Sequence, residues 1–298
     1  MTMEPFRRKL IPLVSWVDSH TGGSLSVLHI AFERFNRVRG PEAAASIGYY
    51  ALFSLFPLLL VLVSVLGYLL VNQNPVDVIE SVLRMVPVSR SFIIESLTGI
   101  VQQRSTIGLI GLAGLGWAAS GVFLTLLRNL NRAWPAATNR SFLEGRLAAL
   151  AMVALMVAGL LLIFVLVTLS NVLPRLNVPI QGSVAVYRSS VWQVLASLVP
   201  WFLAFLVFLG LYRWGPNTHV PWRQALWGAV LATIAWEIAT LVFTWYLRNY
   251  GLESYQLIYG PLGASIALLT WIYLTAYITL FGAHISAAVG AIDRRKED

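Results

Sequence analysis

Residues 147–174 read LAALAMVALMVAGLLLIFVLVTLSNVLP, a run that contains no Asp, Glu, Lys or Arg. A bilayer core about 30 Å thick is crossed by roughly 20 apolar residues in a helix that rises about 1.5 Å per residue. The stretch is therefore long enough to span a membrane. Four further stretches are also free of charge, namely residues 43–76, 105–127, 189–212 and 254–292, and residues 224–247 contain a single acid, Glu237.

These stretches predict an all-α, polytopic membrane protein with six transmembrane helices, joined by interfacial and external amphipathic helices. Hydrophobic residues make up 58% of the chain and charged residues 11%, against about 25% charged residues in soluble domains. A water-soluble core is thereby excluded. The expected spans are about 43–71, 105–127, 147–173, 189–212, 223–248 and 259–290.

We expect one membrane domain, residues 41–292, between a cytoplasmic N-terminal region, residues 1–40, and a cytoplasmic tail, residues 293–298. The connections on the side shared by both termini hold 15 Lys and Arg, and those on the other side hold 6. By the positive-inside rule both termini are predicted to be cytoplasmic. The net charge of +8 is spread over helix ends rather than gathered in one patch, so no nucleic-acid partner is expected.

Two regions outside the spans have helical periodicity. Residues 24–37 place Leu25, Leu28, Phe32 and Phe35 on one face, which suits a helix lying on the inner leaflet or one packed on the protein itself. Residues 72–104 have two helical patterns separated near Pro87 and predict an external helical cap.

Three of the expected spans carry polar side chains along one helical face. Ser and Thr can bond the carbonyl one turn earlier, so such faces fit either a polar interior or dry helix packing. As candidate pathway residues we take Ser46, Tyr50, Ser54 and Pro57 in the first span, Thr233, Glu237 and Thr240 in the fifth, and Tyr273 and Tyr277 in the sixth.

Glu237 is the only acid inside an expected span. An ionised carboxylate facing lipid costs several kcal/mol, so the group should meet water, a cation or a donor, or be protonated. It is either a neutral structural acid or a group that couples proton movement to transport. Pro57, in the middle of its span, removes a helical hydrogen bond and is a candidate for the interrupted helices that surround transporter sites.

The connection between the second and third spans is dense in hydrogen-bond donors. Together with the connection between the fourth and fifth spans, it predicts either an anion-attracting cytoplasmic vestibule or a set of lipid-phosphate contacts. The candidate vestibule residues are Arg128, Asn129, Asn131, Arg132, Arg140, Arg146, Asn217 and Arg223.

Several short motifs in order carry a family resemblance across about residues 30–290. They are AAASIGYYALFSLFP at 43–57, WAASG at 117–121, Asn129 and Asn131, Ala133-Trp134, GPN at 215–217, VPWR at 220–223, Gly228, Trp236-Glu237, Tyr246, YGPLG at 259–263 and LFGAH at 280–284. In this order they resemble the YihY/BrkB family of bacterial inner-membrane proteins. One departure is His284, where the family more often has an acid.

The resemblance implies a six-span inner-membrane protein from a family linked to virulence, serum resistance and lipid or solute export, some of whose members carried an older ribonuclease label. The sequence argues against RNA hydrolysis, because its acids are scattered and its four histidines stand apart. No enzyme activity, metal or cofactor is expected; the absence of cysteine already excludes thiolate ligands.

The sequence as a whole predicts a transporter or flippase-like protein for an anionic or amphipathic substrate in the bacterial inner membrane. The competing hypothesis is a membrane-embedded binding or scaffold protein of the cell envelope. Its expected partners are membrane lipids and an unidentified lipid or small-molecule substrate, and a homo-oligomer is compatible with the sequence. Substrate identity, direction, coupling ion and oligomeric state do not follow from it.

Overall fold

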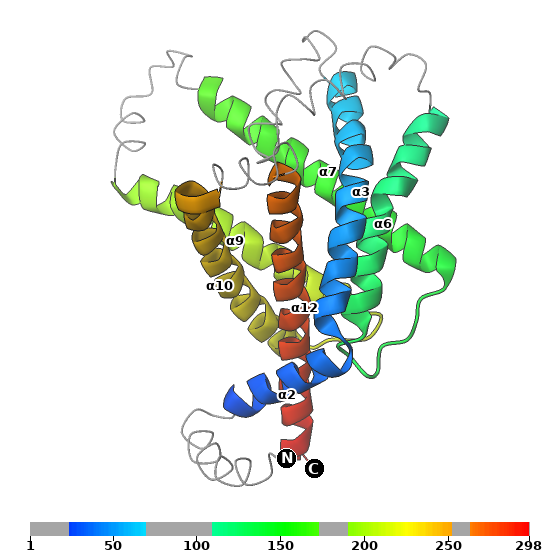
Figure 1. Ribbon diagram of the computed structural model, residues 1–298, viewed down its shortest axis with the longest axis vertical. Coiled ribbons are helices and arrows are strands. Elements are labelled where there is room, and N and C mark those ends of the chain that lie inside the picture. The colour runs from blue at the N-terminus through cyan, green and yellow to red at the C-terminus, as the bar shows by residue number, and fades with distance from the viewer. Residues whose placement is uncertain (1–23, 70–108, 173–189, 252–262, 298) are drawn as a thin grey trace.

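The computed structural model describes residues 24–69, 109–172, 190–251 and 263–297, and every regular element in these ranges is helical (Figure 1). The all-α prediction is confirmed. The elements are α2 (Ser24–Arg37), α3 (Gly40–Leu69), α6 (Leu109–Asn131), α7 (Phe142–Val172), α9 (Ser190–Trp214), α10 (Trp222–Tyr246), the short π-helix η2 (Leu247–Gly251) and α12 (Gly263–Glu297).

Within the described ranges, three helices are long and apolar enough to cross a membrane: Phe142–Gly159, Trp222–Asn249 and Ser265–Asp293. A shorter apolar stretch covers Trp201–Trp214. The chain is thus a helical membrane protein, whereas the count of six spans stays a prediction. The predicted external cap, residues 72–104, lies outside the described residues.

The helix ends differ from the predicted span ends where capping or polar contacts decide them. Helix α7 begins at Phe142 rather than at residue 147, because Ser141 and Glu144 cap it reciprocally. The Ser141 N–H donates to Glu144 Oε2 (3.0 Å), and the Glu144 N–H donates to Ser141 Oγ (3.3 Å). Helix α12 continues to Glu297, through most of the predicted tail. In this last part Asp293 forms an ion pair with Arg223 (3.0 Å).

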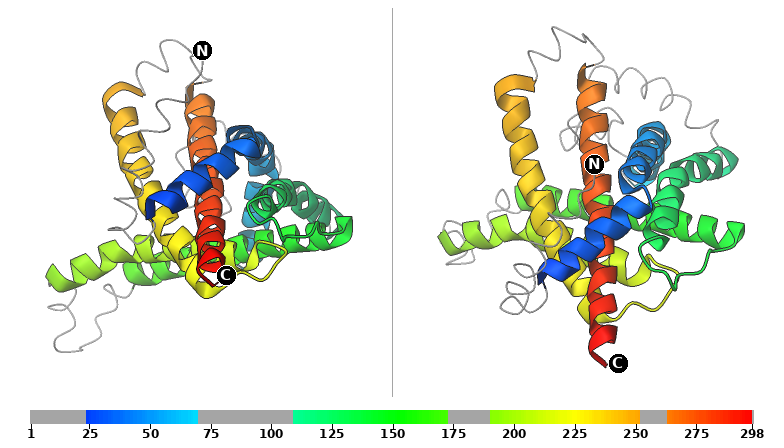
Figure 2. Two further views of the ribbon diagram at one scale, coloured as in Figure 1. Left: turned by 90° about the horizontal axis from the view of Figure 1, so that it is seen from below. Right: turned by 60° about the horizontal axis from the view of Figure 1, so that its bottom comes forward.

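The long helices pack side by side in the spatial order α7, α6, α3, α12, α10, α9. The first and last of them in the chain, α3 and α12, are therefore neighbours at the centre. Helices α7 and α9 run obliquely to the other four (Figures 1 and 2), and α2 and the C-terminal end of α12 lie at the same end of the molecule (Figure 1).

Helix α2 packs on α12 through one face only. The fully buried Phe35 ring lies 4.9, 5.5 and 5.4 Å from the rings of Tyr277, Phe281 and His284. The chain then turns sharply at Arg39, which adopts a left-handed φ of 55°. The next residue is Gly40, where any side chain would collide with the Phe35 ring. Leu25, Leu28 and Phe32, predicted to share one face with Phe35, stay exposed beside this contact, because the buried strip of α2 follows Ala31 and Phe35.

Part of the core lies where α9, α10 and α12 meet. Tyr212 of α9 is fully buried and donates a hydrogen bond to the Thr279 carbonyl of α12 (2.9 Å). Helices α10 and α12 approach closely at Gly228, where an added Cβ would lie 2.6 Å from Ser286 Cβ and 2.9 Å from the Gly282 carbonyl oxygen. Small residues thus allow this contact, as in membrane helix pairs generally.

Candidate functional site

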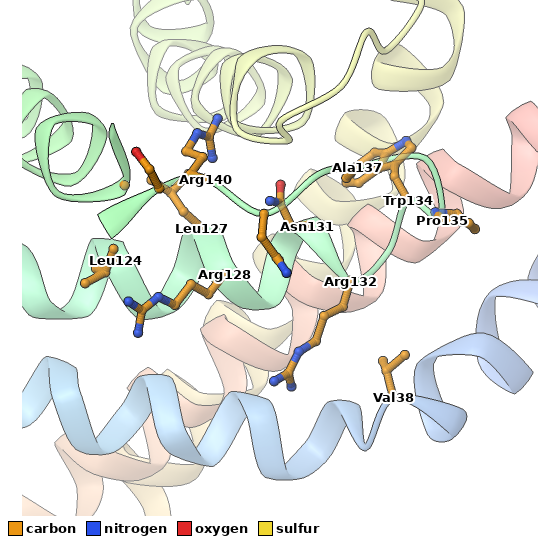
Figure 3. A pocket seen from close by; sticks show the side chains of 13 residues that line it. Val38, Leu124, Leu127, Arg128, Asn131, Arg132, Trp134, Pro135, Ala137 and Arg140 are labelled. Carbon is orange, nitrogen blue, oxygen red and sulfur yellow. The ribbon is translucent and has the colours of Figure 1, made fainter. Parts of the chain in front are cut away.

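A pocket of about 550 Å³ lies at the end of α6 and along the connection to α7 (Figure 3). This volume falls within the usual range for small-molecule sites. Its lining comes from four segments: the α2–α3 turn, α6, the connection that follows it, and the first turns of α7. The lining residues are Val38, Leu124, Leu127, Arg128, Asn131, Arg132, Trp134, Pro135, Ala137, Asn139, Arg140, Ser141 and Gly145.

Among the residues that the structure describes, three arginines line this basic pocket and no acidic side chain does. Arg128 and Arg132 are one helical turn apart and project to the same side of α6, toward α3, while Arg140 projects from the connection in another direction (Figure 3). Partial burial lowers the pKa of Arg140, and the nearby Glu144 carboxylate opposes that shift. Arginine remains protonated at physiological pH in any such setting, so the pocket is cationic.

The pocket also has an apolar wall. Leu124 and Leu127 are buried on α6, and Val38 and Trp134 add apolar lining at the other end of the pocket (Figure 3). Guanidinium groups hold carboxylate and phosphate oxygens through paired hydrogen bonds, whereas an aliphatic wall favours hydrocarbon. The lining is thus chemically suited to an anion that carries an apolar part.

Side-chain amides hold the pocket's connection in place. Asn131 Oδ1 accepts a hydrogen bond from the Asn217 backbone N–H (2.8 Å), and Asn131 Nδ2 donates to the Thr138 carbonyl (3.1 Å). Asn217 Nδ2 donates to both the carbonyl (3.2 Å) and the hydroxyl (2.9 Å) of Thr138. These bonds, which we call the Asn131–Asn217 link, tie two connections far apart in the sequence and fix the shape of the pocket.

Four of the eight predicted vestibule residues line the pocket: Arg128, Asn131, Arg132 and Arg140. Asn217 supports it through the Asn131–Asn217 link. The remaining three lie elsewhere. Asn129 donates to the Thr125 carbonyl of its own helix (2.9 Å), Arg223 pairs with Asp293, and Arg146 contacts Ser120 and Trp117.

The candidate pathway hydroxyls mostly bond within their own helices. Thr233 and Thr240 each donate to the carbonyl one turn earlier, in both cases at 2.8 Å. Ser54 instead joins two helices, because its hydroxyl donates to the Ala118 carbonyl of α6 (3.2 Å). Tyr50 is 45% exposed. These contacts fit helix packing, and none of the candidate pathway residues lines the basic pocket.

The other candidate pathway residues lie on α3, α10 and α12. Ser46 and Pro57 are half-buried on α3, which continues as one helix through Pro57. The rings of Tyr273 and Tyr277 lie 6.2 Å apart on α12. Glu237 is 8% exposed on α10 and makes no hydrogen bond to another residue in the described ranges. The residue is thus largely buried, and its carboxyl group has no fixed partner there.

Sequence reasoning missed the Asn131–Asn217 link and the buried position of Tyr212. Both asparagines belong to the motifs of the family resemblance, and so do Gly228 and Gly282, which lie near Tyr212. No sequence periodicity, however, indicates a hydrogen bond between two connections. His284, the departure from the family pattern, is 2% exposed; its Nδ1 lies 2.8 Å from the Leu280 carbonyl and its ring packs on Phe35.

An all-helical membrane protein with a basic pocket at one end is the class that fold and site define. Comparison with known families makes the assignment narrower: the sequence model of the family described as virulence factor BrkB matches residues 31–298. The chain belongs to this family of bacterial membrane proteins.

Relatives agree with that assignment. A ribonuclease-like protein of Bacillus subtilis, YfkH, is 29% identical over 88% of this chain and 94% of its own length. A UPF0761 membrane protein of Chromohalobacter salexigens is 30% identical over 92% of this chain and 65% of its own length, so this chain spans less than two thirds of that relative. The UPF0761 membrane protein VV0203 of Vibrio vulnificus is 29% identical over 86% of this chain and 80% of its own. No solved structure matches.

The word ribonuclease in one relative's name describes that protein alone. Within the described ranges of this chain, no three His, Cys, Asp or Glu side chains lie close enough together to hold a metal ion. The expectation that the chain has neither catalytic activity nor a cofactor stays a prediction.

Proposed function

We propose that this protein is a transporter or flippase-like protein of the bacterial inner membrane that accepts an anionic, amphipathic substrate from the cytoplasmic side. The observation that carries the proposal is the basic pocket, which combines Arg128, Arg132 and Arg140 with an apolar wall and has no acidic lining residue. Such a lining attracts anions and disfavours cations by several-fold even in partly exposed geometry.

The cytoplasmic placement of the pocket follows from the charge asymmetry of the connections, 15 Lys and Arg against 6. Reporter fusions after residue 298 should therefore read cytoplasmic. An external C-terminus would place the pocket on the opposite side and remove its role as an intake site.

The substrate class is best tested in proteoliposomes. A fluorescent phosphatidylglycerol should move between leaflets faster in vesicles with the protein than in protein-free vesicles, and faster than the matching phosphatidylcholine. The double variant Arg128→Gln/Arg132→Gln should lose this anionic preference, because it removes the two guanidinium groups that project together. The matched control is Arg37→Gln, an exposed arginine of α2 that pairs with Glu33 (2.9 Å) and does not itself line the pocket.

The competing function is a binding or scaffold protein without transport. It would be favoured if the protein bound the anionic lipid with the same dependence on Arg128 and Arg132 but left its movement between leaflets unchanged. Equal movement of both lipids in the wild type would contradict an anion-selective transporter.

A further inference from the structure

Arg146 lies in an environment different from that of the three pocket arginines. It occupies the second turn of α7, and its guanidinium packs against α6: Nη1 donates to Ser120 Oγ (2.8 Å) and to the Trp117 carbonyl (3.3 Å). The guanidinium carbon lies 4.1 Å from the centre of the Trp117 ring and 5.9 Å from that of Phe142. The two rings are themselves neighbours, 6.2 Å apart, so the cation lies on the Trp117 face beside this ring pair, held by two hydrogen bonds and its contact with Trp117.

This cation has no acidic partner among the described residues. The nearest acid in the sequence, Glu144, accepts the Ser141 N–H instead. Arginine carries five N–H donors, of which the two bonds to Ser120 and Trp117 occupy Nη1. Nε is buried without a hydrogen-bond partner, and Nη2 makes no hydrogen bond to another residue in the described ranges. A positioned positive charge with unused donors is left half-buried at the α6–α7 contact.

The surroundings of Arg146 are those of a membrane surface. The apolar stretch Phe142–Gly159 begins at the capped end of α7, so Arg146 lies about 6 Å along the helix from its polar end. Trp117 is 45% exposed, Phe142 63%, and Leu147 57%. Half-exposed aromatic rings and a basic side chain at the start of an apolar helix are typical of the headgroup level of a bilayer.

We propose that Arg146, Trp117 and Phe142 form a binding site for the phosphate of an anionic membrane lipid, separate from the basic pocket. The Trp117 ring and the two hydrogen bonds of Nη1 hold the guanidinium in one orientation, the unused Nη2 donates to the phosphate, and the exposed leucines of α7 contact the acyl chains. The site does not depend on transport, so it stands or falls independently of the proposed function.

The absence of native cysteine allows a direct test. A fluorophore is attached to Leu147→Cys in the full-length protein reconstituted in vesicles. Brominated lipids that contact the fluorophore quench its fluorescence. We expect brominated phosphatidylglycerol to associate about tenfold more strongly than brominated phosphatidylcholine, because both lipids carry a phosphate but the choline cation of the second repels Arg146 and offsets the phosphate charge. The matched control is Leu155→Cys on the same helix, which is 74% exposed and should report equal quenching by both lipids.

Variants then assign the preference to the site. Arg146→Gln should abolish the preference at position 147, whereas Phe142→Leu, which keeps the charge but removes one ring, should reduce it. Equal quenching by both lipids at position 147 of the wild type would overturn the proposal, and so would a preference that survives Arg146→Gln. The wild-type comparison does not depend on whether the variants fold.

A further experiment distinguishes binding of a lipid headgroup from binding of free phosphate. Inorganic phosphate added to the wild type should reduce the preference no more than chloride of equal ionic strength does, because the acyl chains anchor the lipid. Loss of the preference in phosphate alone would make this a site for the soluble anion and would overturn the lipid assignment.

Discussion

The contact of α9, α10 and α12 and the segment from α6 to α7 use polar groups in opposite ways. In the first, the Tyr212 hydroxyl is buried and bonded to Thr279, and small residues let the helices approach closely. In the second, Arg128 and Arg132 are exposed and line a pocket without acids. Satisfied buried groups stabilise a fold, whereas cations left without counter-charges are available to a ligand. Changes that disturb bonded or closely packed groups should therefore affect stability, and changes to Arg128 or Arg132 should affect binding.

The largest loss of stability is expected from Gly282→Ala. Its new methyl group would meet the Tyr212 hydroxyl and lie 2.8 Å from Ala232 Cβ. Overpacking of this kind costs about 1–3 kcal/mol, so the thermal midpoint of the detergent-solubilised protein should fall by several degrees.

The matched control is Gly114→Ala, in α6, where an added Cβ meets nothing within 4 Å. It should leave the midpoint unchanged or raise it, because alanine favours helix more than glycine does. If both alanine variants behaved alike, close packing of α10 on α12 would not be a source of stability.

Asn131→Ala should come next, since it removes two hydrogen bonds of the Asn131–Asn217 link. Leaving the Asn217 N–H without its acceptor costs about 1–3 kcal/mol. Hydrogen exchange should become faster in residues 132–141 while α10 and α12 stay protected. Asn131→Asp keeps an acceptor for Asn217 and should lose less protection; equal exchange in both variants would contradict the role given to that acceptor.

The helical membrane fold could be predicted because runs without charge, such as residues 147–174, reflect the cost of placing ions in lipid. Helix α7 begins five residues before the predicted span of 147–173, since the capping pair Ser141 and Glu144 lies outside the charge-free run. The cluster of Arg128, Arg132 and Arg140 was also visible, because all three fall in one connection. The position of Arg146 against α6 could not be predicted from the sequence, since it depends on how α7 crosses α6 rather than on any local pattern.

A smaller loss is expected from Tyr212→Phe. The change deletes one buried hydrogen bond to Thr279 while keeping the ring, which should cost about 1 kcal/mol. Thermal unfolding in detergent measures this directly. A midpoint as low as that of Gly282→Ala would show that the hydroxyl, rather than the close helix approach, dominates this contact.

Glu237→Gln should change stability least, because glutamine keeps the shape of a buried side chain that has no fixed partner in the described ranges. If Glu237 couples protons to substrate movement, the variant should fold normally and lose the pH dependence of transport. Full activity with an unaltered pH profile would leave Glu237 a structural acid.

Binding at the basic pocket is the most direct test of the central claim. A fluorophore on Asn139→Cys, at the exposed lining, should respond to a short-chain phosphatidylglycerol, and its affinity should fall with rising salt. Arg128→Gln/Arg132→Gln should weaken that affinity by about tenfold or more, since each charge-assisted bond is worth roughly that factor, while Arg37→Gln leaves it unchanged. Equal affinity in the wild type and the double variant would contradict the assignment of this pocket as the anion site.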